Sequence, residues 1–330
     1  MDLSTANTEA LLRFHRSHEQ LNRSIKVQVI GIGLLADEID AGTPEEAIKQ
    51  KLYARPGWLW GGMPDWTQPK CEVEAALRDI GQGGIIRAFS AFDLFLDETR
   101  GELDSWHYFL SENGMPGPTS DAADTVDSAT DKVENFYQRH GATRVRISHL
   151  WAVYRYFRLA RNCIAHREGI ASRALVEAYA APEIAPTLER WVERTSEMAA
   201  PLLVPIEEGK PVSFTHRQAI AASSTLRLIA LDITQLVIDQ LGEKGFVYIA
   251  ARRAFFKSPP LPEALEMTSM VKTFNKVMAN RYRVRSYDPN EGLRILRELG
   301  LTKQCTARFA EIKKQADALS GAIPPTDKAI

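Results

Sequence analysis

The chain has 330 residues, a formal net charge of −1 and three cysteines. That length is enough for about two domains, each with a buried core of its own. Cys71, Cys163 and Cys305 are odd in number, far apart and without a C-x-x-C pair, which argues against a disulfide framework and against a zinc knuckle. The near-neutral charge argues against a protein coated in nucleic acid.

The N-terminal thirty residues carry charges throughout and lack an apolar block before a small-residue cleavage site. They therefore do not resemble a secretory signal. No stretch of the sequence is expected to span a membrane. We expect a cytoplasmic protein that has no membrane partner.

Charge is segregated along the chain. Residues 132–173 contain nine Lys or Arg against two Glu, and residues 252–303 contain eleven Lys or Arg against five acidic residues. Residues 93–131 contain ten Asp or Glu and a single Arg. The basic stretches, including Arg281, Arg283 and Arg285, could bind a polyanion. Charged faces also occur on ordinary helices, so charge alone does not decide between these interpretations.

Apolar residues recur at intervals of three and four, which predicts an all-α fold. Thr43, Pro44 and Glu46 supply the N-cap, first and third positions of one helix start, and Asp288, Pro289 and Glu291 supply those of another, which Gly300 ends. In chain order, helices are expected over residues 7–39, 44 onward, 71–80, 85–96, 132–140, 144–167, 170–197, 215–241, 289–299 and 302 onward.

Gly81, Gly83 and Gly84 are expected to interrupt a helix. They are not expected to form a phosphate-binding loop, because no strand precedes them and no Lys-Ser or Lys-Thr follows. Residues 55–70 and 111–131 are expected to be loops. These breaks, with the proline-rich stretch after residue 257, divide the chain into an N-terminal helical extension with an aromatic loop (1–70), a central helical domain (71–256) and a small helical C-terminal domain (257–330). Its tail from about residue 321 is expected to be disordered.

One segment has a chemically specific pattern. Placed on a helix at about 100° per residue, residues 147–166 separate into two faces. The apolar face carries Leu150, Val153, Phe157, Ala160 and Ile164. The opposite face carries Arg155, Arg158, Asn162 and His166, with Arg161 between the two faces. A helix end with several guanidinium groups, an amide and an imidazole offers charge for a phosphate and a group that titrates near neutral pH.

The run Arg161-Asn162-Cys163-Ile164-Ala165-His166 resembles the signature of HEPN domains, which are all-helical modules. Arg167-Glu168-Gly169 is also in keeping with that family. The segment 87–96 is similar to an early helix of such domains in which a carboxylate faces the motif, and Asp93 stands at the matching position. The resemblance covers residues 71–256.

The spacing of Arg and His is not specific by itself, because this chain repeats it three more times. The other copies are Arg13 with His18, Arg100 with His107 and Arg144 with His149. The copy at Arg161 differs from them because Asn directly follows the Arg, the helix is amphipathic, and an acidic helix lies upstream. This context supports the resemblance.

The resemblance implies metal-independent cleavage of RNA by a homodimer, without a cofactor, as in a toxin or antiviral defence effector that an antitoxin or another protein regulates. His166 would accept the proton of a ribose 2′-hydroxyl, and Arg161 would hold the scissile phosphate. Asn162 would fix the imidazole or a phosphate oxygen, and Asp93 would orient the Arg or the His. The RNA backbone would contact Arg155, Arg158 and Arg167.

Arg161 and His166 are five residues apart, which places them about 140° around an unbroken helix from each other. Either the helix loosens near Cys163 or a second protomer completes the site, and the second explanation is favoured. Two other functions remain open. The chain can be a HEPN-like module that binds RNA or protein without cutting, or a helical regulator that acts through its dimer surface alone.

Other candidate residues give weaker signals. His15 and His18 lie three apart on the first helix, but no third residue of metal-ligand type is near them, so a surface or packing role is expected and no metal site is predicted. Ser223 and Ser224 lack the sequence context of a nucleophile. The aromatic residues of the first loop, Trp58, Trp60 and Trp66, favour packing over base stacking.

Overall fold

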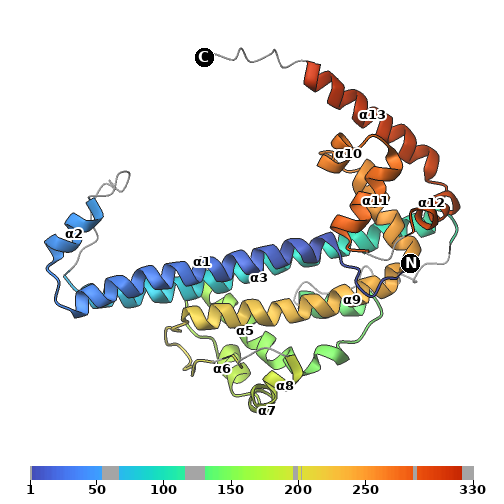
Figure 1. The fold of residues 1–330 in the computed structure, drawn as a ribbon. Helices are drawn as coiled ribbons and strands as arrows, with labels where there is room; N and C mark the ends of the chain where they lie inside the picture. Colours follow the sequence, from blue (N-terminus) through green and yellow to red (C-terminus); the bar gives the residue numbers. More distant parts are fainter. Residues whose placement is uncertain are drawn as a thin grey trace, which may run out of the picture. The chain divides into compact units, whose positions relative to one another are not determined.

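The computed structural model describes residues 2–53, 67–115, 131–195, 200–201, 203–284 and 288–321. Within these residues the fold is all-α, with thirteen α-helices, one 3-10 helix and no β-strand (Figure 1). The predicted fold class is confirmed. The aromatic loop with its three tryptophans, most of the expected loop at 111–131, and the tail after Gly321 lie outside the described residues.

The chain divides into two compact units, which we call unit 1 (residues 1–13, 95–144 and 231–330) and unit 2 (residues 14–94 and 145–230). Three long helices have residues in both units: α1 (Glu9–Asp40), α3 (Pro69–Glu112) and α9 (His216–Phe255). The units therefore differ from the three contiguous segments expected from the sequence. The sequence divisions were placed at loops, whereas each core here is formed by parts of long helices that continue into the other unit.

The remaining helices are short. Unit 2 contains α2 (Glu45–Tyr53), η1 (Val145–Leu150), α5 (Trp151–His166), α6 (Arg173–Tyr179), α7 (Ile184–Glu189) and α8 (Trp191–Thr195). Unit 1 contains α4 (Lys132–Arg139), α10 (Pro262–Glu266), α11 (Met270–Arg281), α12 (Pro289–Glu298) and α13 (Thr302–Gly321). The expected cap at Asp288 is confirmed, because its Oδ1 accepts a hydrogen bond from the Asn290 amide at 2.9 Å. Gly300 follows α12 with a φ of 71°, which suits a helix-ending glycine.

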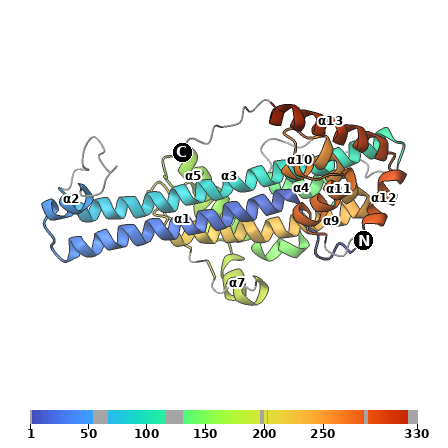
Figure 2. The same cartoon turned by 45° about the horizontal axis from the view of Figure 1, so that its top comes forward.

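In unit 2, α1 and α3 form an antiparallel pair (Figure 2). Phe14 of α1 meets Phe92 of α3 edge-on, with ring centroids 5.7 Å apart. At the other end of the pair, Lys70 Nζ lies 2.6 Å from Asp40 Oδ1. The pair buries one face of each helix, because Leu21, Ile25, Ile85 and Phe89 are all less than 5% exposed. Burial of these apolar side chains is the main source of its stability.

The expectation that glycines interrupt the helix is wrong, because α3 runs unbroken through all three. A Cβ atom on Gly81 would lie 2.0 Å from the carbonyl oxygen of Phe214, and one on Gly84 would lie 2.6 Å from the Cβ of Ala219. A Cβ on Gly83 would meet nothing within 4 Å. Gly81 and Gly84 therefore allow α3 to approach the start of α9 more closely than any other residue would.

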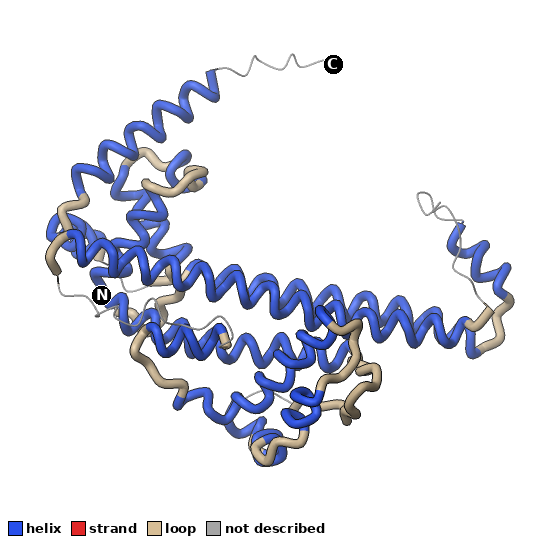
Figure 3. The backbone as a smooth tube through the Cα atoms, turned by 180° about the vertical axis from the view of Figure 1, so that it is seen from behind, coloured by secondary structure: helices blue, strands red, loops and turns tan. Residues whose placement is uncertain are grey.

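The end of α5 and the segment before α9 are joined by short backbone pairing. Ile170 and Pro211 form an isolated bridge, and the Val212 amide donates to the Gly169 carbonyl at 2.9 Å. Apart from this bridge the described backbone is helix and loop (Figure 3). Gln82 of α3 adds a hydrogen bond from its Nε2 to the Val212 carbonyl at 3.2 Å. The end of α5 is thus held against α3 and the start of α9.

Helix α9 is longer than the predicted 215–241, because it continues through a non-helical residue, Gly242, to Phe255. Glycine tolerates the φ of 53° and ψ of −169° that this kink requires. By length and composition α9 could cross a membrane, contrary to the expectation from the sequence, and half of its most apolar window is buried in the protein. The core helix of a soluble protein passes the same test.

In unit 1, a buried ionic network joins the start of α1 to the end of α9 and to α11. Glu9 accepts hydrogen bonds from Arg253 Nε and Arg281 Nη1, each at 2.9 Å. Arg281 also pairs with Glu263, at 3.1 Å. The basic run expected to bind a polyanion is therefore not available as a whole, because Arg281 is engaged in this network. Arg283 is exposed, and residue 285 lies outside the described residues.

Glu102 of α3 lies close to this network. Burial, supported by the neighbouring carboxylates of Glu9 and Glu98 and opposed by Lys257 and Arg13, raises the pKa of its carboxyl to about 8. Its Oε2 atom is buried and has no hydrogen-bond partner in the described part of the chain. Unit 1 thus keeps one carboxyl group neutral at neutral pH.

The glycine contact predicts opposite effects for two alanine substitutions on one helix. Gly81→Ala should destabilise the protein by on the order of 2–4 kcal/mol, because the new methyl group overlaps the Phe214 carbonyl. Gly83→Ala should be neutral or stabilise it by about 0.5–1 kcal/mol, because alanine favours a helix and the site is open. Urea unfolding of both variants tests this, and equal effects would contradict the contact.

The buried carboxyl predicts a pH dependence of stability. Below pH 4.5 Glu102 is protonated in both states, whereas between pH 4.5 and about 8 only the unfolded state loses the proton, so stability should fall as pH rises. Glu102→Gln should remove this fall and exceed the parent at pH 8 by on the order of a few kcal/mol. The control is Glu112→Gln, at an exposed position of the same helix. Thermal unfolding from pH 4 to pH 8 measures the difference, and parallel curves for Glu102→Gln and the parent would refute it.

Candidate functional site

The motif predicted from the sequence lies at the C-terminal end of α5. The predicted apolar face is buried at Val153, Phe157 and Ala160, and Ile164 is half-buried. The helix starts at Trp151, later than expected, because residues 145–150 form a 3-10 helix. Helix α5 therefore presents its last turn, including the motif, at the surface of unit 2.

Helix α5 remains regular through the motif. The Arg167 amide donates to the Cys163 carbonyl at 3.0 Å, as the next residue of an α-helix does. Glu168 and Gly169 then take φ values of 53° and 78°, and the Gly169 amide donates to the same carbonyl at 3.1 Å. Two successive left-handed residues end the helix sharply. The helix does not loosen near Cys163, so the angle between Arg161 and His166 persists.

Arg161 and Asn162 are joined directly. Arg161 Nη1 donates to Asn162 Oδ1 at 3.1 Å, and both side chains are half-buried. The Asn162 oxygen accepts from Arg161, and the structure shows no hydrogen bond between Asn162 and the imidazole of His166. His166 is exposed at the last position of the helix. The motif thus consists of an oriented guanidinium group and a separate, accessible imidazole.

Cys163 is the buried residue behind the motif. Its thiol is 1% exposed and donates to Ser172 Oγ at 3.5 Å. The same hydroxyl accepts from the Leu175 amide at 3.3 Å and so caps α6. The motif helix is therefore anchored to α6 through its inward face, which leaves Arg161 and His166 on its flanks.

Asp93 does not lie with the motif within one chain. No hydrogen bond or ion pair joins it to Arg161, Asn162 or His166, all of which the structure describes. Phe89 of α3 is beside Tyr154, near the start of α5, with ring centroids 6.3 Å apart, and Gln82 is beside the end of α5. The two helices run in opposite directions, so Asp93 lies toward the start of α5 and away from its end.

The three arginines expected to bind RNA differ in exposure. Arg155 and Arg167 are exposed, whereas Arg158 is half-buried and has partners within the protein. Arg155 lies near the start of α5, and Arg167 is its C-cap. They provide an accessible positive charge on either side of Arg161.

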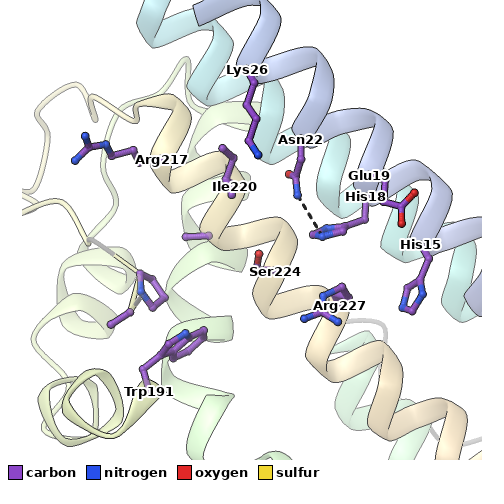
Figure 4. A pocket seen from close by; sticks show the side chains of 13 residues that line it. His15, His18, Glu19, Asn22, Lys26, Trp191, Arg217, Ile220, Ser224 and Arg227 are labelled. Carbon is purple, nitrogen blue, oxygen red and sulfur yellow. Dashed lines mark hydrogen bonds between the residues drawn. The ribbon is translucent and has the colours of Figure 1, made fainter. Parts of the chain in front are cut away.

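A second feature, which the sequence analysis missed, is a cleft in unit 2 of about 880 Å³ (Figure 4). Its walls are stripes of α1 and α9 with helical spacing, and α8 contributes one side chain. From α1 come His15, His18, Glu19, Asn22 and Lys26. From α9 come Arg217, Ile220, Ala221, Ser224 and Arg227, and the remaining residues are Trp191, Ala200 and Pro201. Both stripes follow the spacing of one helix face, which is the signal that could have revealed them.

Both ring nitrogens of His18, which lines this cleft, have hydrogen-bond contacts. Its Nδ1 atom lies 2.7 Å from Ser223 Oγ, and its Nε2 atom lies 3.2 Å from Asn22 Nδ2. The expectation of a packing role for His18 therefore omits a polar contact between residues 205 positions apart. Ser223 is 1% exposed and lies inside α9. A serine inside a helix has no free backbone amides beside it for an oxyanion hole, so this pair is better suited to binding than to acyl transfer.

Comparison of the chain with protein-family models, curated proteins and solved structures finds no match. The resemblance to HEPN domains therefore rests on the motif residues and their setting at the end of α5. Within the described residues, no group of three or more His, Cys, Asp or Glu side chains is arranged to hold a metal ion.

Proposed function

We propose that the chain is a metal-independent endoribonuclease of HEPN type, which acts as a homodimer and serves as a toxin or antiviral defence effector. The observation that carries the proposal is the end of α5. There an exposed imidazole, His166, follows an Arg161–Asn162 pair held by a 3.1 Å hydrogen bond. A regulatory protein such as an antitoxin would control the activity by covering this exposed corner.

The proposed reaction uses the hydroxyl group of the substrate. His166 accepts the 2′-hydroxyl proton, and the 2′ oxygen forms a bond to the adjacent phosphorus while the bond to the 5′ oxygen breaks. The leaving 5′ oxygen takes a proton from water or from a protonated His166 of the partner subunit. Arg161, oriented by Asn162, offsets the charge that develops on the phosphate. This reaction requires no metal ion.

The regular helix supports a dimeric site. Because α5 is unbroken to its last residue, Arg161 and His166 remain about 140° apart around its axis. Two copies related by a twofold axis can place Arg161 of one protomer beside His166 of the other. Arg155, near the start of α5, and Arg167, at its C-cap, are both exposed and would then contact the RNA backbone on both sides of the site.

A second candidate function is a HEPN-like module that binds RNA or a protein without cleavage. The position of Asp93 favours it, because no carboxylate among the described residues pairs with the imidazole of His166 within one chain. A helical regulator that acts through its dimer surface alone makes no use of the exposed Arg155 and Arg167. Binding of RNA without cleavage products would indicate the HEPN-like binding module. Absence of RNA binding would indicate the helical regulator.

The first test of the proposal is the loss of cleavage on removal of the imidazole. His166→Ala should cut RNA at least about a hundredfold more slowly than the parent, which is the usual size of a general-base contribution. RNA binding should persist, because the arginines remain. The control is His216→Ala, which removes a half-buried histidine of the same unit from outside the motif. Cleavage at the parental rate by His166→Ala, or loss of cleavage on adding a chelator, would refute the mechanism.

The second test addresses the dimer. Arg161→Ala and His166→Ala should each be inactive alone, but an equal mixture that has exchanged subunits should regain activity, because one composite site in each mixed dimer is intact. With random exchange the recovery should reach about a quarter of the parental rate. Exchange itself is checked by affinity capture of a tagged His166→Ala protomer, which should bring untagged Arg161→Ala with it from the mixture. No recovery by the first mixture would show that the site is formed within one chain.

A further inference from the structure

We propose that α12 and α13 form a helix-turn-helix that binds double-stranded DNA, with α13 in the major groove. The inference is independent of the proposed RNA cleavage at α5, because both helices belong to unit 1 and α5 belongs to unit 2. Three features support it: the turn between the two helices, the exposed face of α13, and the positive charge around that face.

The turn between α12 and α13 is short and well defined. Gly300 has a φ of 71°, and its amide donates to the Arg297 carbonyl at 3.0 Å. The Leu301 amide donates to the Leu296 carbonyl at 2.9 Å. These two hydrogen bonds form the Schellman motif, which ends a helix and redirects the chain. Leu296, Leu301 and Cys305 are each less than 8% exposed, so the turn is also packed from within. A short turn that contains glycine is typical of a helix-turn-helix.

Helix α13 leaves α12 and does not fold back along it. In the C-terminal half of α13, Lys313 donates to the Leu265 carbonyl of α10. Phe309 meets Phe255 of α9 edge-on, with ring centroids 6.3 Å apart. Figures 1 and 2 show the same course, away from α12 and beside α10. In an antiparallel hairpin the two helices would lie side by side, so α12 and α13 are an angled pair, as in a helix-turn-helix.

The face of α13 that points away from its buried residues is suited to a DNA groove. Four exposed residues share this face at helical spacing: Lys303, Ala307, Ala310 and Lys314. Gln304 is exposed beside them. The two alanines leave the middle of the face flat, so the helix can approach a groove closely. Lysine and glutamine pair with guanine and adenine in the major groove, and alanine contacts the thymine methyl group. The first turns of α13 therefore have the composition of a helix that contacts base edges.

Positive charge surrounds this face. Residues 281–314 contain nine Lys or Arg against four Asp or Glu. Arg297, Lys303 and Lys314 are exposed, and none of them forms an ion pair with any residue that the structure describes. The two lysines lie about 16 Å apart along the axis of α13, so they can reach phosphates on both sides of a groove about 12 Å wide. Charge complementarity therefore favours a nucleic acid as the occupant.

Double-stranded DNA fits this face better than RNA does. The major groove of DNA admits an α-helix, whereas that of an RNA duplex is too deep and narrow for side chains to read. A single strand has no groove, and proteins bind it largely by stacking its bases on aromatic side chains. None of the exposed residues that the structure describes on α13 is aromatic. The occupant that uses the whole face is therefore a DNA duplex.

The test is the fluorescence anisotropy of a labelled DNA duplex of mixed sequence, titrated with the full-length protein at about 50 mM salt. The parent should bind the duplex. Lys303→Ala/Lys314→Ala should weaken binding by about tenfold or more and lower the slope of log affinity against log salt by about two, because two phosphate contacts are lost. The control Arg23→Ala/Lys26→Ala removes the same charge from exposed positions of α1 in unit 2 and should change the affinity by less than about twofold.

A second variant tests the groove contact itself. Ala307→Glu places a carboxylate in the middle of the exposed face, where it would meet the negative charge of the DNA, and should weaken binding by about tenfold or more. Glutamate favours a helix, and the position is exposed, so the unfolding temperature should match that of the parent. An equal unfolding temperature for each variant separates loss of binding from loss of the fold.

Three results would overturn the proposal: no binding of the DNA duplex by the parent, unchanged binding in Lys303→Ala/Lys314→Ala, or an equal loss in the control variant. A fourth is a loss of RNA duplex binding in Lys303→Ala/Lys314→Ala as large as the loss of DNA binding, which would make the face a general polyanion surface. DNA lacks the 2′-hydroxyl that the proposed cleavage requires. His166→Ala should therefore bind the DNA duplex as tightly as the parent, and failure of either proposal leaves the other standing.

Discussion

The close contact between α3 and the start of α9 is the constraint on which unit 2 depends. Gly81 and Gly84 place two helix backbones where a Cβ atom would overlap the Phe214 carbonyl or Ala219. The segment before α9 then pairs with Gly169 directly after the motif, through the hydrogen bond from Val212. The same contact fixes the first turns of α9, which form one wall of the cleft. Both the motif and the cleft are therefore positioned by the absence of two side chains.

Local patterns were enough to predict the all-α class, the capped helix after Asp288 and the buried face of α5, because each depends on residues within a few turns of one another. The glycines of α3 were misinterpreted for the opposite reason. Their effect depends on Phe214, more than a hundred residues later in the sequence. The division into units was missed on the same grounds, since long helices take part in both cores and loop composition does not record this.

The candidate site was predictable in part. The sequence places Arg161, Asn162 and His166 at the end of an amphipathic helix, and the structure has them there. The pairing of Arg161 with Asn162, rather than of Asn162 with His166, depends on rotamers that no sequence pattern reports. The cleft was not predicted because its walls come from α1 and α9, which are far apart in the sequence, although the lining residues of each helix follow helical spacing.

In the proposed mechanism, His166 and Arg161 direct the 2′-hydroxyl of RNA against its own phosphate. The most direct measurement is the chemistry of the product ends, determined by mass spectrometry after the protein cuts a defined oligoribonucleotide. The mechanism predicts a 2′,3′-cyclic phosphate or a 3′-phosphate on one fragment and a 5′-hydroxyl on the other. It also predicts that a single 2′-O-methyl group at the cut site blocks the reaction. Fragments with a 5′-phosphate, or cleavage of the methylated substrate at the same position, would contradict it.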